Sequence, residues 1–283
     1  MIQRTSLGRA IAIFALSSRA SPSSLSTPNF PGNYALTMIQ DIPGPQNLEN
    51  VAVRYTGDLL ATSTTSSSLF QHCAHWYYRI GTRYILCRLI EYDRDTAVPG
   101  SNAVWRVDMR AVRTAKNGTV SGAAQFTLVT KLPDAQLLNG LCRLAPNDNS
   151  NFLISDSVSG SVTKLNIHTG KSEIVIQDDT MKISQTGLPI GINGIHTHEC
   201  DLFFVNLNQQ FTLVEADIAE KRSSTMANSS LLLSDSAVTF GRTHFDWNSL
   251  YITSAGTTSA GNGSMEGRVI RVDLPYTCTD FSF

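Results

Sequence analysis

The sequence predicts an all-β protein, a six-bladed β-propeller of four-stranded antiparallel blades. Short runs of alternating apolar and polar residues are separated by polar turns along most of the chain. The pattern returns about every 40 to 50 residues, which is the repeat length of propeller blades. No segment has the apolar spacing of a long amphipathic helix, which argues against an α/β fold.

The most complete repeat begins at Asn139 and ends at Ile176. Turn residues separate four strand-like runs in it, which are GLCRLA, NFLISDS, SVTKLNI and SEIVIQ. Four strands within about 40 residues make one blade. The next repeat begins at Asn193 with GIHTH, DLFFVNL and FTLVEADI, and another begins near Ala237 and contains NSLYITSAG and RVIRVDL.

The N-terminal half of the repeat pattern is less complete. The segment from Asn50 to Ser63 predicts an antiparallel hairpin with one buried face. After it, NAVWRVDMRAV and AAQFTLVTKL predict two outer strands. Six blades need about 270 residues, so we expect one blade, at about 64–101, to be short or degraded. This stretch must supply the end of one blade and the start of the next, and a deletion or a gene-model error would give the same shortfall.

The composition limits the classes of partner. Charged residues make up 16% of the chain and the formal net charge is −1, so nucleic acid is not an expected partner. Hydrophobic residues make up 42% and are spread along the chain, which excludes a disordered protein. No run approaches the ~18 apolar residues of a membrane span. We expect a monomer.

The N-terminus has the order of residues seen in a targeting peptide. Basic residues precede the apolar run from Ala10 to Leu16, and small residues follow, so we predict a signal or targeting peptide at 1–22 and a single propeller domain at 35–283. The secretory pathway or secretion is the expected location, with the cytoplasm as the alternative. In the secretory route, three sequons would accept N-glycans, at Asn117, Asn228 and Asn262.

The remaining polar motifs are more typical of structural roles than of catalysis. Five cysteines lack metal-binding spacing, and we expect Cys142 to be a buried apolar residue. His196 and His198 share one strand face, where partly exposed polar positions are expected and a metal-binding pair is the alternative. Asp178 and Asp179 in IQDDT predict a turn between blades. The chain has no nucleophile elbow, P-loop or dinucleotide fingerprint.

Two Asn-Gly pairs, at Asn139 and Asn193, each precede a run of alternating residues. Asn-Gly favours turns, and an asparagine also caps strands, so both roles compete with a place at the channel. The succession of ENVAV, VWRVDMR, LLNG, ISDSVSGSVTKLNIHTGKSEIVIQDDTMK and LPIGINGI resembles the fungal branch of the SMP-30/gluconolactonase-like six-bladed propellers. Within that branch the chain is similar to the hetero-Diels–Alderases of tropolone sesquiterpenoid biosynthesis.

The resemblance implies a polar site at one mouth of the channel. Metal-dependent lactonases of the superfamily hold a divalent cation there, and their ligand positions correspond to Glu49, Asn139 and Asn193, the last of which is an Asp in those enzymes. An amide cannot accept a proton from water near neutral pH, so Asn193 would not act as a general base. One carboxylate and two amides also make a weak cation site.

These substitutions favour a site that orients organic substrates without a cofactor. By the resemblance, the reaction is an intermolecular hetero-Diels–Alder cycloaddition between a tropolone o-quinone methide and a humulene-type olefin, with Glu49, Asn139 and Asn193 lining the channel. Such a reaction needs two partners held in a reactive geometry. One alternative is a lactonase or esterase whose Ca²⁺ or Zn²⁺ is held by the same residues. A second alternative is a non-catalytic ligand-binding propeller.

Overall fold

The structure, a computed structural model, is built almost entirely from β-strands. It describes residues 35–42, 48–53, 59–63, 77–80, 84–89, 92–93, 96–108, 110–111, 113–114, 120–145, 147–183, 189–198, 201–206, 212–254, 258–259, 263–264 and 267–274. The helical segments in these ranges are two single 3-10 turns, η1 (Asp179–Met181) and η2 (Ser230–Leu232). None of the helices in the described ranges is long and apolar enough to cross a membrane.

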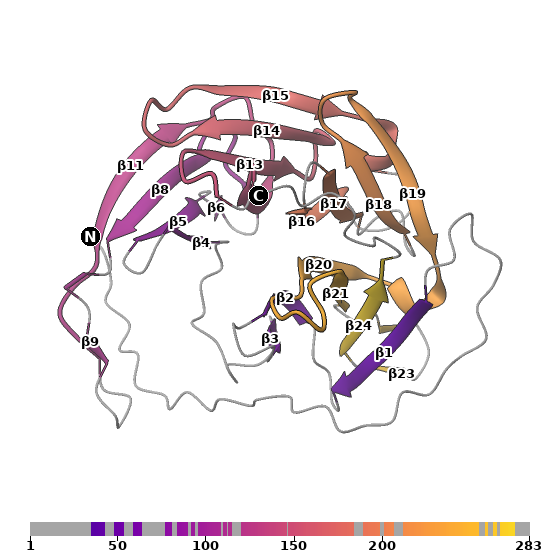
Figure 1. The fold of residues 1–283 in the computed structure, drawn as a ribbon. Coiled ribbons are helices and arrows are strands. Elements are labelled where there is room, and N and C mark those ends of the chain that lie inside the picture. Colours follow the sequence, from indigo (N-terminus) through magenta and orange to yellow (C-terminus); the bar gives the residue numbers. More distant parts are fainter. Residues whose placement is uncertain are drawn as a thin grey trace, which may run out of the picture.

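Four antiparallel sheets of four strands each lie around a common centre, with their innermost strands nearest to it (Figure 1). This arrangement confirms the predicted β-propeller, while the number of blades stays a prediction. From the innermost strand outward, the sheets are β4 (Tyr77–Ile80), β5 (Tyr84–Leu89), β8 (Ala103–Asp108) and β11 (Gln125–Lys131); β12 (Leu138–Arg143), β13 (Asn151–Asp156), β14 (Ser161–Asn166) and β15 (Ser172–Gln177); β16 (Ile192–His198), β17 (Asp201–Asn206), β18 (Thr212–Asp217) and β19 (Arg222–Asn228); and β20 (Asp235–Phe240), β21 (Ser249–Ser254), β24 (Gly267–Asp273) and β1 (Ala35–Ile42).

Four smaller sheets have two strands each. One is the predicted N-terminal hairpin, and the other three lie in connections between blade strands. They are β2 (Leu48–Val53) with β3 (Leu59–Ser63), β6 (Tyr92–Asp93) with β7 (Thr96–Ala97), β9 (Arg113–Thr114) with β10 (Val120–Ser121), and β22 (Thr258–Ser259) with β23 (Gly263–Ser264). The β2–β3 sheet packs through β2 against β20, so it continues the ring beside the last four-stranded blade.

The last blade is completed by the N-terminal strand. β1 pairs antiparallel with β24, from Ala35 opposite Asp273 to Ile42 opposite Gly267. A strand from the beginning of the described chain therefore forms the outer edge of a blade whose other strands come from its end. This pairing joins the first and the last described strands within one sheet, and Figure 1 shows β1 beside β24.

The stretch predicted as a short blade, about 64–101, contributes strands to a complete one. β4 and β5 form the inner half of the blade whose outer strands are β8 and β11. The stretch therefore supplies the start of a blade, as predicted. The prediction that the stretch also ends the preceding blade concerns residues 64–76, which lie outside the described ranges.

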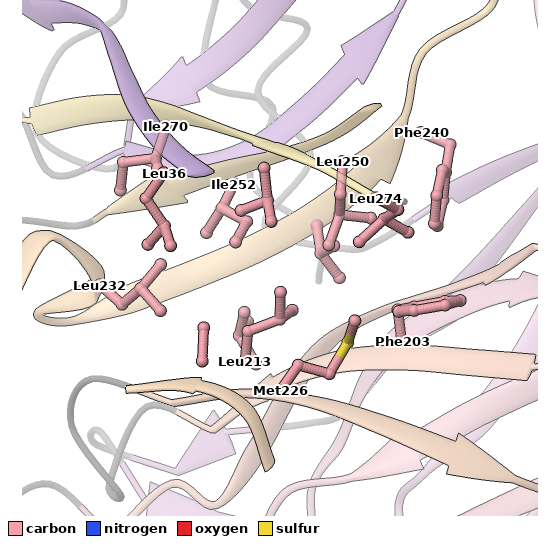
Figure 2. Close-up of a cluster of buried hydrophobic side chains, with 14 residues drawn as sticks. Leu36, Phe203, Leu213, Met226, Leu232, Phe240, Leu250, Ile252, Ile270 and Leu274 are labelled. Carbon is pink, nitrogen blue, oxygen red and sulfur yellow. The ribbon is translucent and has the colours of Figure 1, made fainter. Parts of the chain in front are cut away.

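The blades are held together by apolar clusters between neighbouring sheets. Figure 2 shows one such cluster, in which side chains of the β16–β19 blade face those of the β20, β21, β24 and β1 blade. Phe203, Leu213 and Met226 come from the first blade, and Phe240 and Ile252 are among the residues from the second. In β13 and β17 all residues after the first are buried, because both faces of these strands are covered.

Two glycines allow the innermost strands to approach each other closely. A Cβ atom added at Gly140 would lie 2.6 Å from the carbonyl oxygen of Asn193, and one added at Gly194 would lie 2.5 Å from the Cα of Ala237. Both contacted atoms belong to the backbone, so a side chain at either position would push the neighbouring strands apart. The glycine of each Asn-Gly pair therefore sets the spacing of β12, β16 and β20.

Candidate functional site

The two predicted asparagines lie side by side at the start of adjacent innermost strands. Asn139 is the second residue of β12 and Asn193 the second residue of β16. Both sit at irregularities in the pairing with the next strand, between Leu138 and Leu141 and between Ile192 and Ile195. The Asn-Gly pairs are therefore β-bulges within strands, and the hairpin-turn alternative is wrong.

Ser157 connects these two strand starts. Its hydroxyl donates to the carbonyl oxygen of Ile192 at 2.5 Å and accepts from the side-chain amide nitrogen of Asn139 at 2.8 Å. The neighbouring Ser155 makes a parallel connection, donating to the carbonyl oxygen of Asn193 at 2.8 Å. Two hydroxyl groups at the end of β13 thus fix the position of both asparagines relative to one another.

Each asparagine keeps its side-chain oxygen without a hydrogen-bond partner among the described residues. Asn139 is 6% exposed and Asn193 is 2% exposed, and the Oδ1 atom of each is buried. A buried polar atom without a partner costs about 1–3 kcal/mol, so native proteins keep few of them. Two such atoms on adjacent strands indicate a site for a group that carries a hydrogen-bond donor or a positive charge.

Asp235 carries two more buried oxygens without partners among the described residues, and this residue was not predicted from the sequence as part of the site. Asp235 is the first residue of β20 and corresponds to Leu138 of β12 and Ile192 of β16, because each pairs with the last residue of the next strand. It is fully buried, and neither carboxylate oxygen has a partner within the described ranges. Burial raises the pKa of Asp235 well above its ordinary value.

The pKa shift of Asp235 is towards the protonated carboxyl group, which can donate one hydrogen bond and can also accept. The sequence did carry a signal for this residue. An acidic side chain stands at the start of an innermost strand where the other repeats have an aliphatic residue, Leu138 or Ile192. Asp235 therefore adds a second kind of polar group to the end of the ring that holds Asn139 and Asn193.

Glu49, the third predicted site residue, lies on the innermost strand of the two-stranded sheet. It is the second residue of β2, as Asn139 and Asn193 are of their strands, but its side chain lies outside the described atoms. The start of β2 meets the start of β20, since the hydroxyl of Ser236 donates to the carbonyl oxygen of Leu48 at 2.7 Å. β20 thus stands between the asparagines and Glu49.

The residues present fit a divalent cation of the calcium type better than zinc. Amide and carboxylate oxygens are the ligands that Ca²⁺ accepts, and the buried Oδ1 atoms of Asn139 and Asn193 are of that kind. Zn²⁺ prefers nitrogen and sulfur ligands. In the described part of the chain, no three His, Cys, Asp or Glu residues are grouped as a metal site.

The other predicted polar residues have structural partners. Asp178 caps η1, accepting from the backbone and hydroxyl of Thr180 at 2.9 and 2.8 Å, as expected for a turn between blades. His196 and His198 are partly exposed, and their rings pack on Phe240. Cys142 is buried with a free thiol, as predicted, and burial raises its pKa.

One of the three predicted glycosylation positions falls on described residues. Asn228 is exposed at the end of β19. Asn117 and Asn262 lie outside the described ranges. Glycosylation therefore stays a prediction at all three positions.

Comparison with known proteins supports the fold alone. No family model and no curated protein matches the chain. A luciferin-regenerating enzyme of known structure is 13% identical, with a TM-score of 0.52 over 86% of this chain and 96% of that chain. The calcium-binding protein regucalcin from Agrobacterium tumefaciens is 13% identical, with a TM-score of 0.43 over 82% and 75% of the two chains.

A chain of a nidogen–laminin complex is also 13% identical, with a TM-score of 0.41 over 60% of this chain. The match covers 53% of that chain, so this protein spans about half its length. The similarity to the luciferin-regenerating enzyme extends over nearly the whole of both chains and supports the propeller fold. At this level of identity it assigns no activity.

Proposed function

We propose that the protein is a propeller enzyme that binds small organic substrates where its innermost strands begin, and that it catalyses an intermolecular hetero-Diels–Alder cycloaddition. The observation that carries the proposal is the pair of buried, unpartnered amide oxygens of Asn139 and Asn193. By the resemblance, Asn193 stands where a hydrolytic relative would hold the Asp that activates water. Neutral acceptors suit a substrate that must be oriented, because they bind its hydroxyl groups without removing a proton.

The reaction class follows from what these groups do and from the resemblance to the tropolone sesquiterpenoid enzymes. An o-quinone methide supplies a four-atom heterodiene and a humulene-type olefin supplies two carbons. One C–C and one C–O bond form, no atom leaves, and no oxidant or cofactor is required. Holding both partners in a reactive geometry lowers the barrier by up to about 7–11 kcal/mol.

The orientation of the Asn139 amide limits what this residue can do for a substrate. The side-chain nitrogen of Asn139 already donates to Ser157, so this residue offers an acceptor to the ligand. An acceptor cannot stabilise negative charge on the heterodiene oxygen. We therefore assign Asn139 to holding a substrate hydroxyl, while developing negative charge would have to be stabilised by a hydrogen-bond donor.

Incubating the purified protein with a quinone-methide precursor and the olefin tests this proposal. We expect faster formation of the dihydropyran product and a stereoisomer ratio that differs from that of the protein-free mixture. Identical ratios and rates in both mixtures would contradict it. Saturable binding of the substrates without turnover would instead support a ligand-binding propeller.

A metal-dependent lactonase is the second candidate, because the buried Oδ1 atoms of Asn139 and Asn193 are also calcium ligands in kind. With Ca²⁺ bound, the ion would supply Lewis-acid polarisation of a lactone carbonyl, and Asn139 and Asn193 would help to hold it. Lactone hydrolysis that is lost on chelation and restored by Ca²⁺ would favour this function. Hydrolysis that is indifferent to a chelator, or absent, would exclude it.

A further inference from the structure

The hydrogen bonds around Ser157 fix which end of the Asn139 amide faces it. The Oγ atom of Ser157 lies 2.5 Å from the carbonyl oxygen of Ile192 and 2.8 Å from the Asn139 side chain. A carbonyl oxygen can only accept, so the single hydroxyl proton goes to Ile192. Ser157 can then only accept from Asn139, and the nitrogen of the amide must point towards it.

The opposite orientation of the amide would be unfavourable. If the Asn139 side chain turned over, its oxygen would face the lone pairs of Ser157, and the NH₂ group would occupy the buried position now held by Oδ1. Turning the amide over would replace the hydrogen bond from its nitrogen to Ser157 by a contact between two acceptors, because the Ser157 proton is used by Ile192. The two orientations therefore differ by one buried hydrogen bond, which favours the present one.

Ser157 itself is rigidly held. It is 0% exposed, its backbone N–H donates to Leu137 at 2.8 Å, and its carbonyl oxygen accepts from Gly191 at 2.7 Å. The preceding Asp156 accepts from the backbone of Gln136 at 2.7 Å and of Leu137 at 3.0 Å. The segments before β12 and before β16 are both anchored at this turn, so the hydroxyl cannot move away from Asn139.

We propose that Ser157 is a positioning residue that holds the Asn139 oxygen towards the ligand and thereby makes the site select a hydroxyl donor. The inference rests on the proposed function for the location of the ligand and adds the polarity of the group that Asn139 recognises. A substrate hydroxyl is accepted, whereas an ether or carbonyl oxygen at the same place would meet another acceptor. The consequence is selectivity for an enolic or phenolic substrate over its O-alkylated form.

Binding of two probes measures this selectivity without any reaction. The probes are tropolone, buffered on the acid side of its ionisation so that it keeps its hydroxyl proton, and its O-methyl ether. For the wild type we expect about tenfold or more tighter binding of tropolone, since the ether leaves the Asn139 oxygen unpaired. Ser157→Ala should reduce this preference to about twofold, because the amide can then turn over.

Two further variants separate positioning from simple structural support. Thr197→Val removes a buried hydrogen bond between the far ends of β16 and β12 and leaves the contact between Ser157 and Asn139 intact, so the preference should stay at its wild-type value. Ser157→Thr keeps a hydroxyl and should also keep the preference. Thermal unfolding of each variant shows whether its fold is retained.

A measurement on the wild type covers the case in which the Ser157 variants do not fold. In protein labelled with ¹⁵N-asparagine, the Asn139 side-chain NH₂ signal, assigned through Asn139→Leu, should exchange slowly with solvent because it donates to Ser157. Rapid exchange would overturn the proposal. So would an unchanged preference in Ser157→Ala, an equal loss in Thr197→Val, or failure of both probes to bind.

A binding experiment with Ca²⁺ shows whether the Oδ1 atom of Asn139 binds a cation or a substrate hydroxyl. Binding of Ca²⁺ that is lost in Asn139→Leu and competes with tropolone would overturn the hydroxyl assignment. Failure of the proposed function gives a different result. In that case tropolone binds with the expected preference, but no cycloaddition is accelerated.

Discussion

The buried polar side chains at the two ends of β16 differ in their hydrogen bonding. At its start, Asn193 is 2% exposed and its Oδ1 atom has no partner in the described part of the structure. Four positions further on, the hydroxyl of Thr197, 6% exposed, donates to the carbonyl oxygen of Arg143 at 2.8 Å. The same strand is thus fastened to β12 at one end and offers an unpaired acceptor at the other.

Aromatic packing strengthens the far end further. The ring of His198 stacks on Phe240 with centroids 4.2 Å apart and an interplanar angle of 10°, and Trp247 lies 5.3 Å away. His196 is partly exposed as a residue, but the protein atoms packed around its ring desolvate the imidazole and lower its pKa to about 4, so the ring is neutral at pH 7. The far end is thus stabilised by paired polar groups and aromatic packing, while the start keeps a buried acceptor unpaired among the described residues, as the proposed site requires.

The largest expected effect on the free energy of unfolding comes from changing the spacing between β16 and β20. Gly194→Ala would place a Cβ atom 2.5 Å from the Cα of Ala237, so the backbone must shift, and we expect a loss of about 3 kcal/mol. Gly100→Ala is the matched control, with its nearest neighbour 4.0 Å away and φ of +76°, and should lose about 1 kcal/mol. Urea unfolding measures both, and equal losses would show that the inner strands do not need this approach.

The far end should respond to acid. His196 has a folded pKa of about 4, below the unfolded value of about 6.5, so its contribution to stability is full above pH 6.5 and is lost as the pH falls towards 4. The loss between pH 7 and pH 5 is about 2 kcal/mol. Unfolding by urea across this range should show it in the wild type and not in His196→Gln. If the free energy of unfolding changes with pH equally in the two proteins, His196 is solvated in the folded state and the prediction is wrong.

Removing one polar group from each end should change stability in opposite directions. Asn193→Leu replaces an unpaired buried amide by an apolar side chain of similar size, and we expect a gain of about 1 kcal/mol in the free energy of unfolding. Thr197→Val removes the hydrogen bond to Arg143 and should lose about 1 kcal/mol. If Asn193→Leu is destabilising, the amide has a structural partner and the contrast between the ends fails.

Much of the fold was predictable because each blade is local in sequence. The runs predicted as strands in the repeat from Asn139 to Ile176 correspond to β12–β15, and SEIVIQ coincides with β15. β19 was not predicted, because its sequence, RSSTMAN, is an outer strand with little apolar alternation and mostly exposed residues. The pairing of β1 with β24 was not predicted either, since alternation shows that a strand exists but not which distant strand it joins.

The sequence predicted where Asn139 and Asn193 lie, but not which of their atoms are free to bind. The Asn-Gly repeats placed Asn139 and Asn193 at neighbouring strand starts, because equivalent residues of successive blades meet at one end of the ring. The orientation of the Asn139 amide depends on Ser157, which is 18 residues away and has no recognisable motif. The burial of Asp235 depends on packing that no local pattern encodes.

The stereoisomer ratio of the cycloaddition product tests the central claim, that the chemistry takes place where the innermost strands begin, most directly. The quinone-methide precursor and olefin would be incubated with wild type, Asn193→Leu and Thr197→Val at equal folded concentrations. We predict that Thr197→Val gives the wild-type ratio and that Asn193→Leu gives the ratio of the protein-free mixture. A wild-type ratio from Asn193→Leu would contradict the claim.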